Sequence, residues 1–182
     1  MLTLIIGGAR SGKSRVAQSL CSAAGRVSYI ATARDEDAEM RARIERHRLD
    51  RPPHWTTLEE PLALAAAVRS ALPSSDVILV DCLTLWLSNF MRERQGLSAV
   101  ELEAAATAEI EQIACLAAER AVILVSNETG GGIVPDHPVG RLFRDLQGLV
   151  NQAAAARADR VFLTVAGIPV RIKPSPENSI LC

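Results

Sequence analysis

The stretch "GGARSGKS", Gly7 to Ser14, decides the fold. It satisfies the pattern G-x-x-x-x-G-K-[ST], which is typical of a phosphate-binding loop. An apolar run, Leu2 to Ile6, precedes it, and a helical pattern from about Lys13 to Ala24 follows. If a glycine-rich turn matched this pattern by chance, we would not expect a strand directly before it and a helix directly after it. The stretch therefore predicts a P-loop that binds a nucleoside triphosphate.

Two side chains of this loop have roles of their own, and a third residue is expected to join them. Lys13 is placed to reach the β and γ phosphates, and the Ser14 hydroxyl is a candidate Mg²⁺ ligand. A carboxylate is expected where a neighbouring buried strand ends, and Asp81 follows "VILV" there. Asp81 could instead cap the helix that begins in "CLTLWL", and the two roles are compatible. The predicted phosphate loop comprises Gly7, Gly8, Ala9, Arg10, Ser11, Gly12, Lys13 and Ser14.

The rest of the chain alternates between strand and helix patterns. Further strands are predicted at 27–32, 77–81 and 121–126, and helices at 37–49, 61–72, 83–94, 98–119 and 139–158. The runs "RVFLTV" and "VRIK" flank "AGIP" and predict a closing hairpin. This order indicates an α/β fold with a mainly parallel sheet, helices on both faces and an antiparallel C-terminal hairpin.

Composition limits the protein class further. The 182 residues are 48% hydrophobic but only 3% aromatic, which suits one aliphatic α/β domain, expected at 1–173 with a tail at 174–182. A net charge of -1 gives no global attraction for nucleic acid or anionic membranes. The apolar runs are too short or interrupted for a membrane span, and the N-terminus lacks a signal-peptide pattern, so a cytoplasmic protein is expected. Four scattered cysteines indicate reduced thiols rather than a zinc site or disulfides.

A basic segment, "IERHRLDRPPHW" at 44–55, contains two of the three histidines. Four acidic residues at 35–39 precede five arginines at 41–51, an order that complements a helix dipole and favours a solvated helix. However, Met40, Ile44 and His47 are spaced i, i+4 and i+7, which predicts that His47 faces the protein body.

An inward histidine is more often structural than catalytic. Here the flanking arginines and a separate triphosphate site add a second possibility, because an imidazole can attack phosphorus while guanidiniums neutralise phosphate charge. His54 is expected to pack in a turn, and His137 to be a loop residue or a helix cap. Glycines 130–132 also follow a strand, and without Lys or Ser they indicate only a mobile or tight loop.

Six blocks occur in an order that resembles one enzyme family over Met1 to about Lys173. They are "GGARSGKS", "YIAT", "RIERHRLDRPPHW", "VILVDCLTLWLSN", "SNETGGGIVP" and "RLFRDLQGLVNQ". The family is the bifunctional adenosylcobinamide kinase/adenosylcobinamide-phosphate guanylyltransferase of cobalamin biosynthesis. The resemblance implies a RecA-like P-loop NTPase fold, a homotrimer, and two reactions. The first phosphorylates adenosylcobinamide from ATP or GTP, and the second transfers GMP from GTP to the product, giving adenosylcobinamide-GDP and pyrophosphate.

The same resemblance implies a role for particular residues. His47 corresponds to the histidine that carries GMP as a covalent intermediate, and Mg²⁺ is implied on Ser14 and Asp81. Some members end the "VILV" strand with Glu, so Asp81 keeps the carboxylate and shortens its reach. Further nucleotide contacts are implied at Thr32, Ala33, Arg34, Arg48, Leu49, Asp50, Arg51, Glu59 and Asp81.

Two other functions remain compatible with a P-loop. A plain small-molecule kinase would use Lys13 in the same way, with His47 packing only and Arg48 or Arg51 clamping phosphate. A RecA-like assembly or regulatory protein would associate on binding nucleotide without small-molecule chemistry. No N-K-x-D sequence occurs, which disfavours a GTPase switch.

Overall fold

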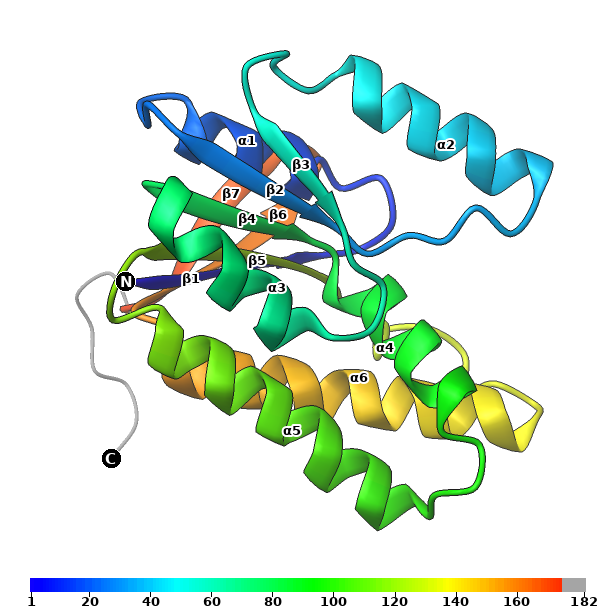
Figure 1. The fold of residues 1–182 in the computed structure, drawn as a ribbon. Helices are drawn as coiled ribbons and strands as arrows, with labels where there is room; N and C mark the ends of the chain where they lie inside the picture. Colours follow the sequence, from blue (N-terminus) through cyan, green and yellow to red (C-terminus); the bar gives the residue numbers. More distant parts are fainter. Residues whose placement is uncertain (175–182) are drawn as a thin grey trace.

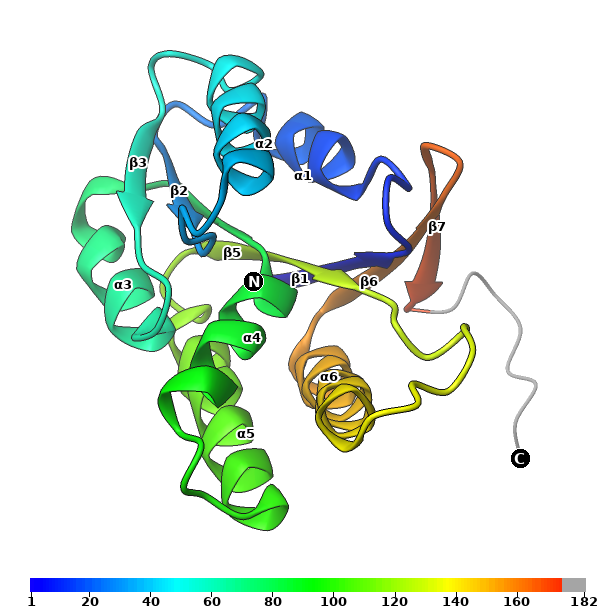
Figure 2. The ribbon, with the colours of Figure 1, turned by 90° about the vertical axis from the view of Figure 1, so that its right-hand side faces the viewer.

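The computed structural model describes residues 1–174, which form one seven-stranded sheet with helices on both faces (Figures 1 and 2). The strands lie in the order β3-β2-β4-β5-β1-β6-β7, and only the β6–β7 pair is antiparallel. This confirms the predicted α/β fold and its closing hairpin. The strands are β1 Leu2–Gly7, β2 Val27–Ala31, β3 Thr56–Glu59, β4 Val77–Asp81, β5 Ala121–Asn127, β6 Arg160–Val165 and β7 Ile168–Lys173.

Helices cover the two faces unequally. Figure 2 shows α1 and α2 on one side of the sheet and α3 to α6 on the other. The larger core lies under α3 to α6 and includes the fully buried Trp86 and Ile110, whereas a smaller core joins α1 to the opposite face through Ala17 and Tyr29. The helices are α1 Lys13–Cys21, α2 Ala38–Leu49, α3 Leu64–Ala71, a 3-10 turn Leu72–Ser74, α4 Leu83–Glu93, α5 Ala99–Leu116 and α6 Pro138–Arg157.

Helix α2 differs from the others because it contains no buried residue. Met40, Ile44 and His47 are half-buried, and every other residue of the helix is exposed. The predicted i, i+4, i+7 stripe is therefore the face that α2 turns toward the protein body, as expected for a one-sided helix. The Asp37 side chain caps its first turn by accepting from the Met40 N–H.

The sequence patterns missed one strand. β3 consists of "TTLE", in which only Leu58 is apolar, so it lacks the alternation that predicts a strand. It forms because its backbone pairs in parallel with β2 at the edge of the sheet. Helix α1 ends at Cys21 and α5 at Leu116, about one turn before the expected ends.

Two local expectations about helix ends are met. Ser98 and Glu101 form the capping box of α5, and His137 caps α6 by accepting from the Gly140 N–H at 3.0 Å. The expected tail at 174–182 lies outside the described residues except for Pro174. Among the described helices, none combines the length and apolar composition needed to cross a membrane.

Candidate active site

The P-loop joins β1 to α1 at the carboxyl edge of the sheet. Gly12 stands at the N-cap of α1 with φ at 92°, a left-handed conformation that glycine adopts without strain. The Lys13 ammonium donates to the Gly8 carbonyl at 2.9 Å, and the residue as a whole is 9% exposed. The pKa of Lys13 is lowered chiefly by burial; the neighbouring Cys82 and Asp81 side chains oppose this shift, and the Arg43 guanidinium makes the smallest contribution to it. The ammonium thus lies curled in the loop where a phosphate would be held.

The closing hairpin supports the loop from the other side. The Gly167 N–H donates to the Ser11 carbonyl at 2.8 Å. A Cβ on Gly12 would lie 3.0 Å from the Gly167 Cα, and one on Gly7 would meet the Ser11 hydroxyl at 2.5 Å. Glycines at both positions therefore permit close approaches that any larger residue would disturb.

Asp81 is the last residue of β4, as predicted. In the sheet, β5 lies between β4 and β1, the strand that leads into the P-loop. Its Oδ2 accepts a hydrogen bond from the Tyr29 hydroxyl at 3.0 Å. The N-cap of α4 is Cys82, and no side chain caps that helix, so Asp81 does not serve as the alternative helix cap. The carboxylate is half-buried and remains directed at the site.

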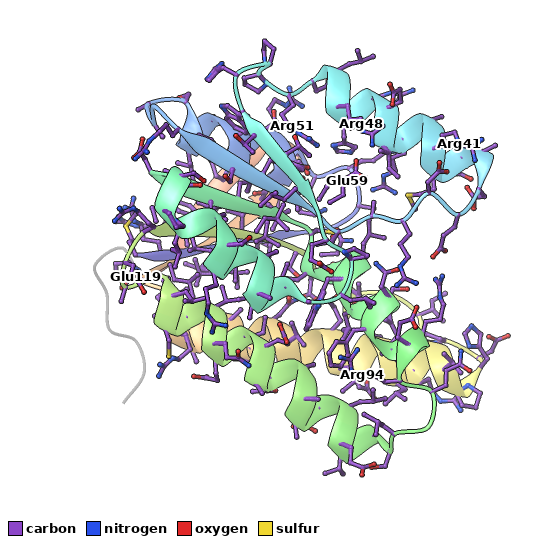
Figure 3. The ribbon with its side chains drawn as sticks, viewed as in Figure 1. Arg41, Arg48, Arg51, Glu59, Arg94 and Glu119 are labelled. Carbon is purple, nitrogen blue, oxygen red and sulfur yellow. The ribbon has the colours of Figure 1, made fainter. Side chains whose placement is uncertain are left out.

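Charged side chains connect the end of α2 to the edge of the sheet. Arg48 forms an ion pair with Glu59 at the end of β3, and both residues are labelled in Figure 3; it also pairs with Glu45 on its own helix. The Arg51 guanidinium lies 3.5 Å from the centre of the Tyr29 ring and donates to the Thr57 hydroxyl at 2.6 Å. Because Tyr29 also donates to Asp81, a continuous chain of contacts runs from Arg51 to the candidate metal ligand.

A cavity of about 190 Å³ lies between α2, the P-loop helix and the ends of β2 and β4. His47 lines it together with Lys13, Ser14 and Asp81. The histidine and two residues of the phosphate loop thus line one space. Four further residues that the resemblance implied also line it, namely Ala33, Arg48, Arg51 and Glu59.

Other predicted contacts lie outside the lining of this cavity. Thr32 is fully buried, and its hydroxyl exchanges hydrogen bonds with the backbone of Cys82 at 2.7 and 2.8 Å, so it ties β2 to β4. Arg34 pairs with Glu93 of α4 at 2.7 Å. Leu49 is 80% exposed, and Asp50 is exposed at the end of α2. His54 is exposed in the turn before β3, away from the lining residues.

Sequence reasoning did not predict several residues that line the cavity, among them Tyr29 and Arg43. Tyr29 was part of the quoted "YIAT" block, but no motif marked it, and only the pairing of β2 with β4 brings it to Asp81. Arg43 precedes His47 by four residues, a helical spacing that places both on one side of α2. That spacing is a signal by which Arg43 could have been found.

The oxygen ligands at the site fit Mg²⁺. Asp81 and Ser14 offer a carboxylate and a hydroxyl, which are hard donors of the kind that Mg²⁺ prefers. Within residues 1–174 no three His, Cys, Asp or Glu side chains gather as a complete metal cage. Two ligands from the protein are consistent with an ion bound mostly through substrate phosphates.

Comparison with known proteins identifies a single family. The family model described as cobinamide kinase / cobinamide phosphate guanyltransferase matches residues 3–172. The chain is 49% identical over 177 residues to the bifunctional adenosylcobalamin biosynthesis protein CobP of Pseudomonas aeruginosa, covering 97% of this chain and 99% of the relative. It is 42% identical over 181 residues to CobU of Escherichia coli, named as a bifunctional adenosylcobalamin biosynthesis protein, covering 95% and 100% of the two chains.

Proposed function

The chain belongs to the cobinamide kinase / cobinamide phosphate guanyltransferase family, and from this premise we propose how one cavity serves both reactions. In the first, the hydroxyl of adenosylcobinamide attacks the γ phosphorus of ATP or GTP. In the second, GMP passes from GTP to the new phosphate through His47. The observation that carries the proposal is that His47 and the P-loop residues Lys13 and Ser14 line the same cavity.

The guanylyl transfer proceeds by two displacements. A ring nitrogen of His47 uses its lone pair to attack the α phosphorus of GTP, the bond to the bridging oxygen breaks, and pyrophosphate leaves. An oxygen of adenosylcobinamide phosphate then attacks the same phosphorus, and the nitrogen–phosphorus bond breaks to restore His47. Two successive displacements, with GMP held on His47 between them, replace a single direct reaction between two bulky anionic substrates.

The surrounding residues orient the nucleotide rather than react. Lys13 and the loop N–H groups hold the terminal phosphates in both reactions. Arg48 in the last turn of α2 and Arg51 just beyond its end line the cavity with His47, and both guanidiniums bind the α phosphate, which displaces Arg48 from its exposed ion pairs with Glu45 and Glu59. Ser14 and Asp81 would hold Mg²⁺, which neutralises charge that develops on the leaving phosphates.

A labelling experiment tests the nucleophile. GTP radiolabelled at the α phosphate is incubated with the protein and Mg²⁺, and the protein is tested for an acid-labile, alkali-stable adduct. The label should be absent from His47→Ala and retained by His54→Ala, because His54 is exposed and lines no part of the cavity. An adduct that survives in His47→Ala overturns the assignment, and a protein that transfers γ phosphate without releasing pyrophosphate is a plain kinase.

We also propose that the protein works as a homotrimer in the cytoplasm. Four large apolar side chains of the closing hairpin are exposed within residues 1–174, which supports burial of this strand against another copy. Both reactions consume nucleoside triphosphates, which supports a cytoplasmic location. The exposed side chains are Val165, Ile168, Val170 and Ile172.

A further inference from the structure

We propose that Arg43 binds the β and γ phosphates of the nucleoside triphosphate together with Lys13. Arg43 thereby holds the pyrophosphate that leaves when His47 takes up GMP. The contact with the leaving pyrophosphate rests on the proposed function. The contact with the β and γ phosphates does not, because a triphosphate in the P-loop would meet Arg43 in either reaction.

The position of Arg43 supports this role. It lines the cavity that Lys13 and His47 also line, and it projects from α2, whereas Lys13 projects from α1. Arg43 lies one helical turn before His47, which is a step of about 6 Å along the helix axis. A triphosphate seated in the P-loop therefore lies between cations from both helices.

The cavity contains other arginines, but carboxylates already engage two of them. Arg41 pairs with Asp35 at 3.0 Å, and Arg48 pairs with Glu45 and Glu59. No ion pair within the described part of the chain involves Arg43.

The remaining arginine of the lining, Arg51, has no carboxylate partner either, and its buried Nε has no hydrogen-bond partner among the described residues, but its guanidinium is held against Tyr29 and Thr57. Among the four arginines of the lining, Arg43 alone makes no ion pair, ring contact or side-chain hydrogen bond within the described residues, so its guanidinium is free to turn to a ligand. A guanidinium recognises phosphate by paired hydrogen bonds, which suits this position.

This arrangement fixes the direction in which the triphosphate lies. With the β and γ phosphates between Lys13 and Arg43, the α phosphate extends along α2 toward His47. One P-loop then serves both reactions, with the γ phosphate transferred in the first and the α phosphate in the second. Arg43 contacts the leaving group of the guanylyl transfer rather than the phosphorus that His47 attacks.

Binding of inorganic pyrophosphate tests the proposal without depending on turnover. The full chain is titrated with pyrophosphate and Mg²⁺ in a calorimeter, for wild type, Arg43→Gln and Arg46→Gln. Arg46 is the matched control, because it is an exposed arginine of the same helix that does not line the cavity. Arg43→Gln should weaken pyrophosphate binding roughly tenfold, as expected for the loss of a charged hydrogen-bonded contact, and Arg46→Gln should bind like wild type.

Two further variants separate the possible outcomes. Arg43→Lys keeps the charge but loses the paired donors, so it should bind pyrophosphate between wild type and Arg43→Gln. His47→Ala should bind pyrophosphate like wild type, so loss of the GMP adduct would test the proposed function alone. Equal weakening in Arg43→Gln and Arg46→Gln would indicate only long-range charge and overturn the proposal, as would no weakening in Arg43→Gln.

Discussion

Lys13 carries its charge into a largely buried position, and the ammonium has only the Gly8 carbonyl as a hydrogen-bond acceptor among the described residues. Burial lowers its pKa from the ordinary value of 10.5. Between the folded pKa and 10.5 the unfolded chain binds more protons than the folded protein, so this residue makes stability rise with pH in that window. The site is therefore strained electrostatically until an anion arrives.

Replacing Lys13 by methionine should remove the unfavourable burial of a charge, and it should also abolish triphosphate binding. At neutral pH, Lys13→Met should be more stable than wild type, and the difference should shrink as pH rises toward 10.5. Urea unfolding of both proteins across this pH range measures the effect, and GTP binding by the variant should be lost. Parallel stability curves would contradict the role of burial.

Tyr29 links Arg51 to Asp81, and its two contacts can be separated by one substitution. Tyr29→Phe keeps the ring beneath the Arg51 guanidinium and removes only the hydroxyl that donates to Asp81. Loss of a residue that orients a metal ligand typically weakens metal binding about tenfold or more. The Mg²⁺ concentration needed for half-maximal GTP binding should rise accordingly, as measured by calorimetry.

GTP binding without Mg²⁺ provides the control for that variant. It should be unchanged in Tyr29→Phe, because the ring and the P-loop are both retained. If the Mg²⁺ dependence matched that of wild type, the hydrogen bond to Asp81 would have no part in orienting the carboxylate.

Among the secondary-structure elements, the sequence predicted the features that depend on spacing within one segment and missed those that depend on contacts between distant segments. The P-loop, the α2 stripe and the α5 capping box depend on spacing within one segment, and each is found where expected. β3 depends on pairing with β2, which no local pattern in "TTLE" encodes. Tyr29 and Asp81 likewise meet only because β2 and β4 are neighbours in the sheet.

Helix α2 should be the least protected of the helices. It contains no buried residue, and the ion pairs between Arg48 and its two partners are largely exposed, so they add little stability. Local opening should therefore expose the α2 amides far more often than those of the buried strands β4 and β5. Hydrogen exchange read by mass spectrometry should show fast exchange at 38–49, and slower exchange after GTP and Mg²⁺ bridge α2 to the P-loop.

Helix α5 serves as the comparison within the same chain. It has a capping box and buried Leu102, Ala106, Ile110 and Ile113, so its exchange should be slow with or without nucleotide. Protection of α2 equal to that of α5 in the free protein would show that α2 is held as firmly as the core helices.

At the scale of the whole molecule, the larger hydrophobic core and the candidate site lie on opposite faces of the sheet. The core beneath α3 to α6 contains most of the large buried side chains, whereas the cavity lies on the opposite face, under α2. From the P-loop motif alone, the sheet and the side of the cavity that contains Lys13 and Ser14 could be predicted. The side formed by α2 could be predicted only from the family resemblance or seen in the structure, because few packing contacts determine the position of a helix without buried residues.

The edge strand β7 provides the last prediction, at the scale of the assembly. Ile168 and Val170 are 65% and 50% exposed on the closing hairpin, and an edge strand with apolar side chains is a natural place for another copy to bind. Analytical ultracentrifugation should give three times the chain mass of 19.5 kDa for wild type and a smaller particle for Val170→Asp. Val100→Asp alters a valine that is 74% exposed on α5 and should sediment like wild type. A wild-type protein that sediments as a single chain would rule out the trimer, and a trimer unaffected by Val170→Asp would assign its interface to another surface.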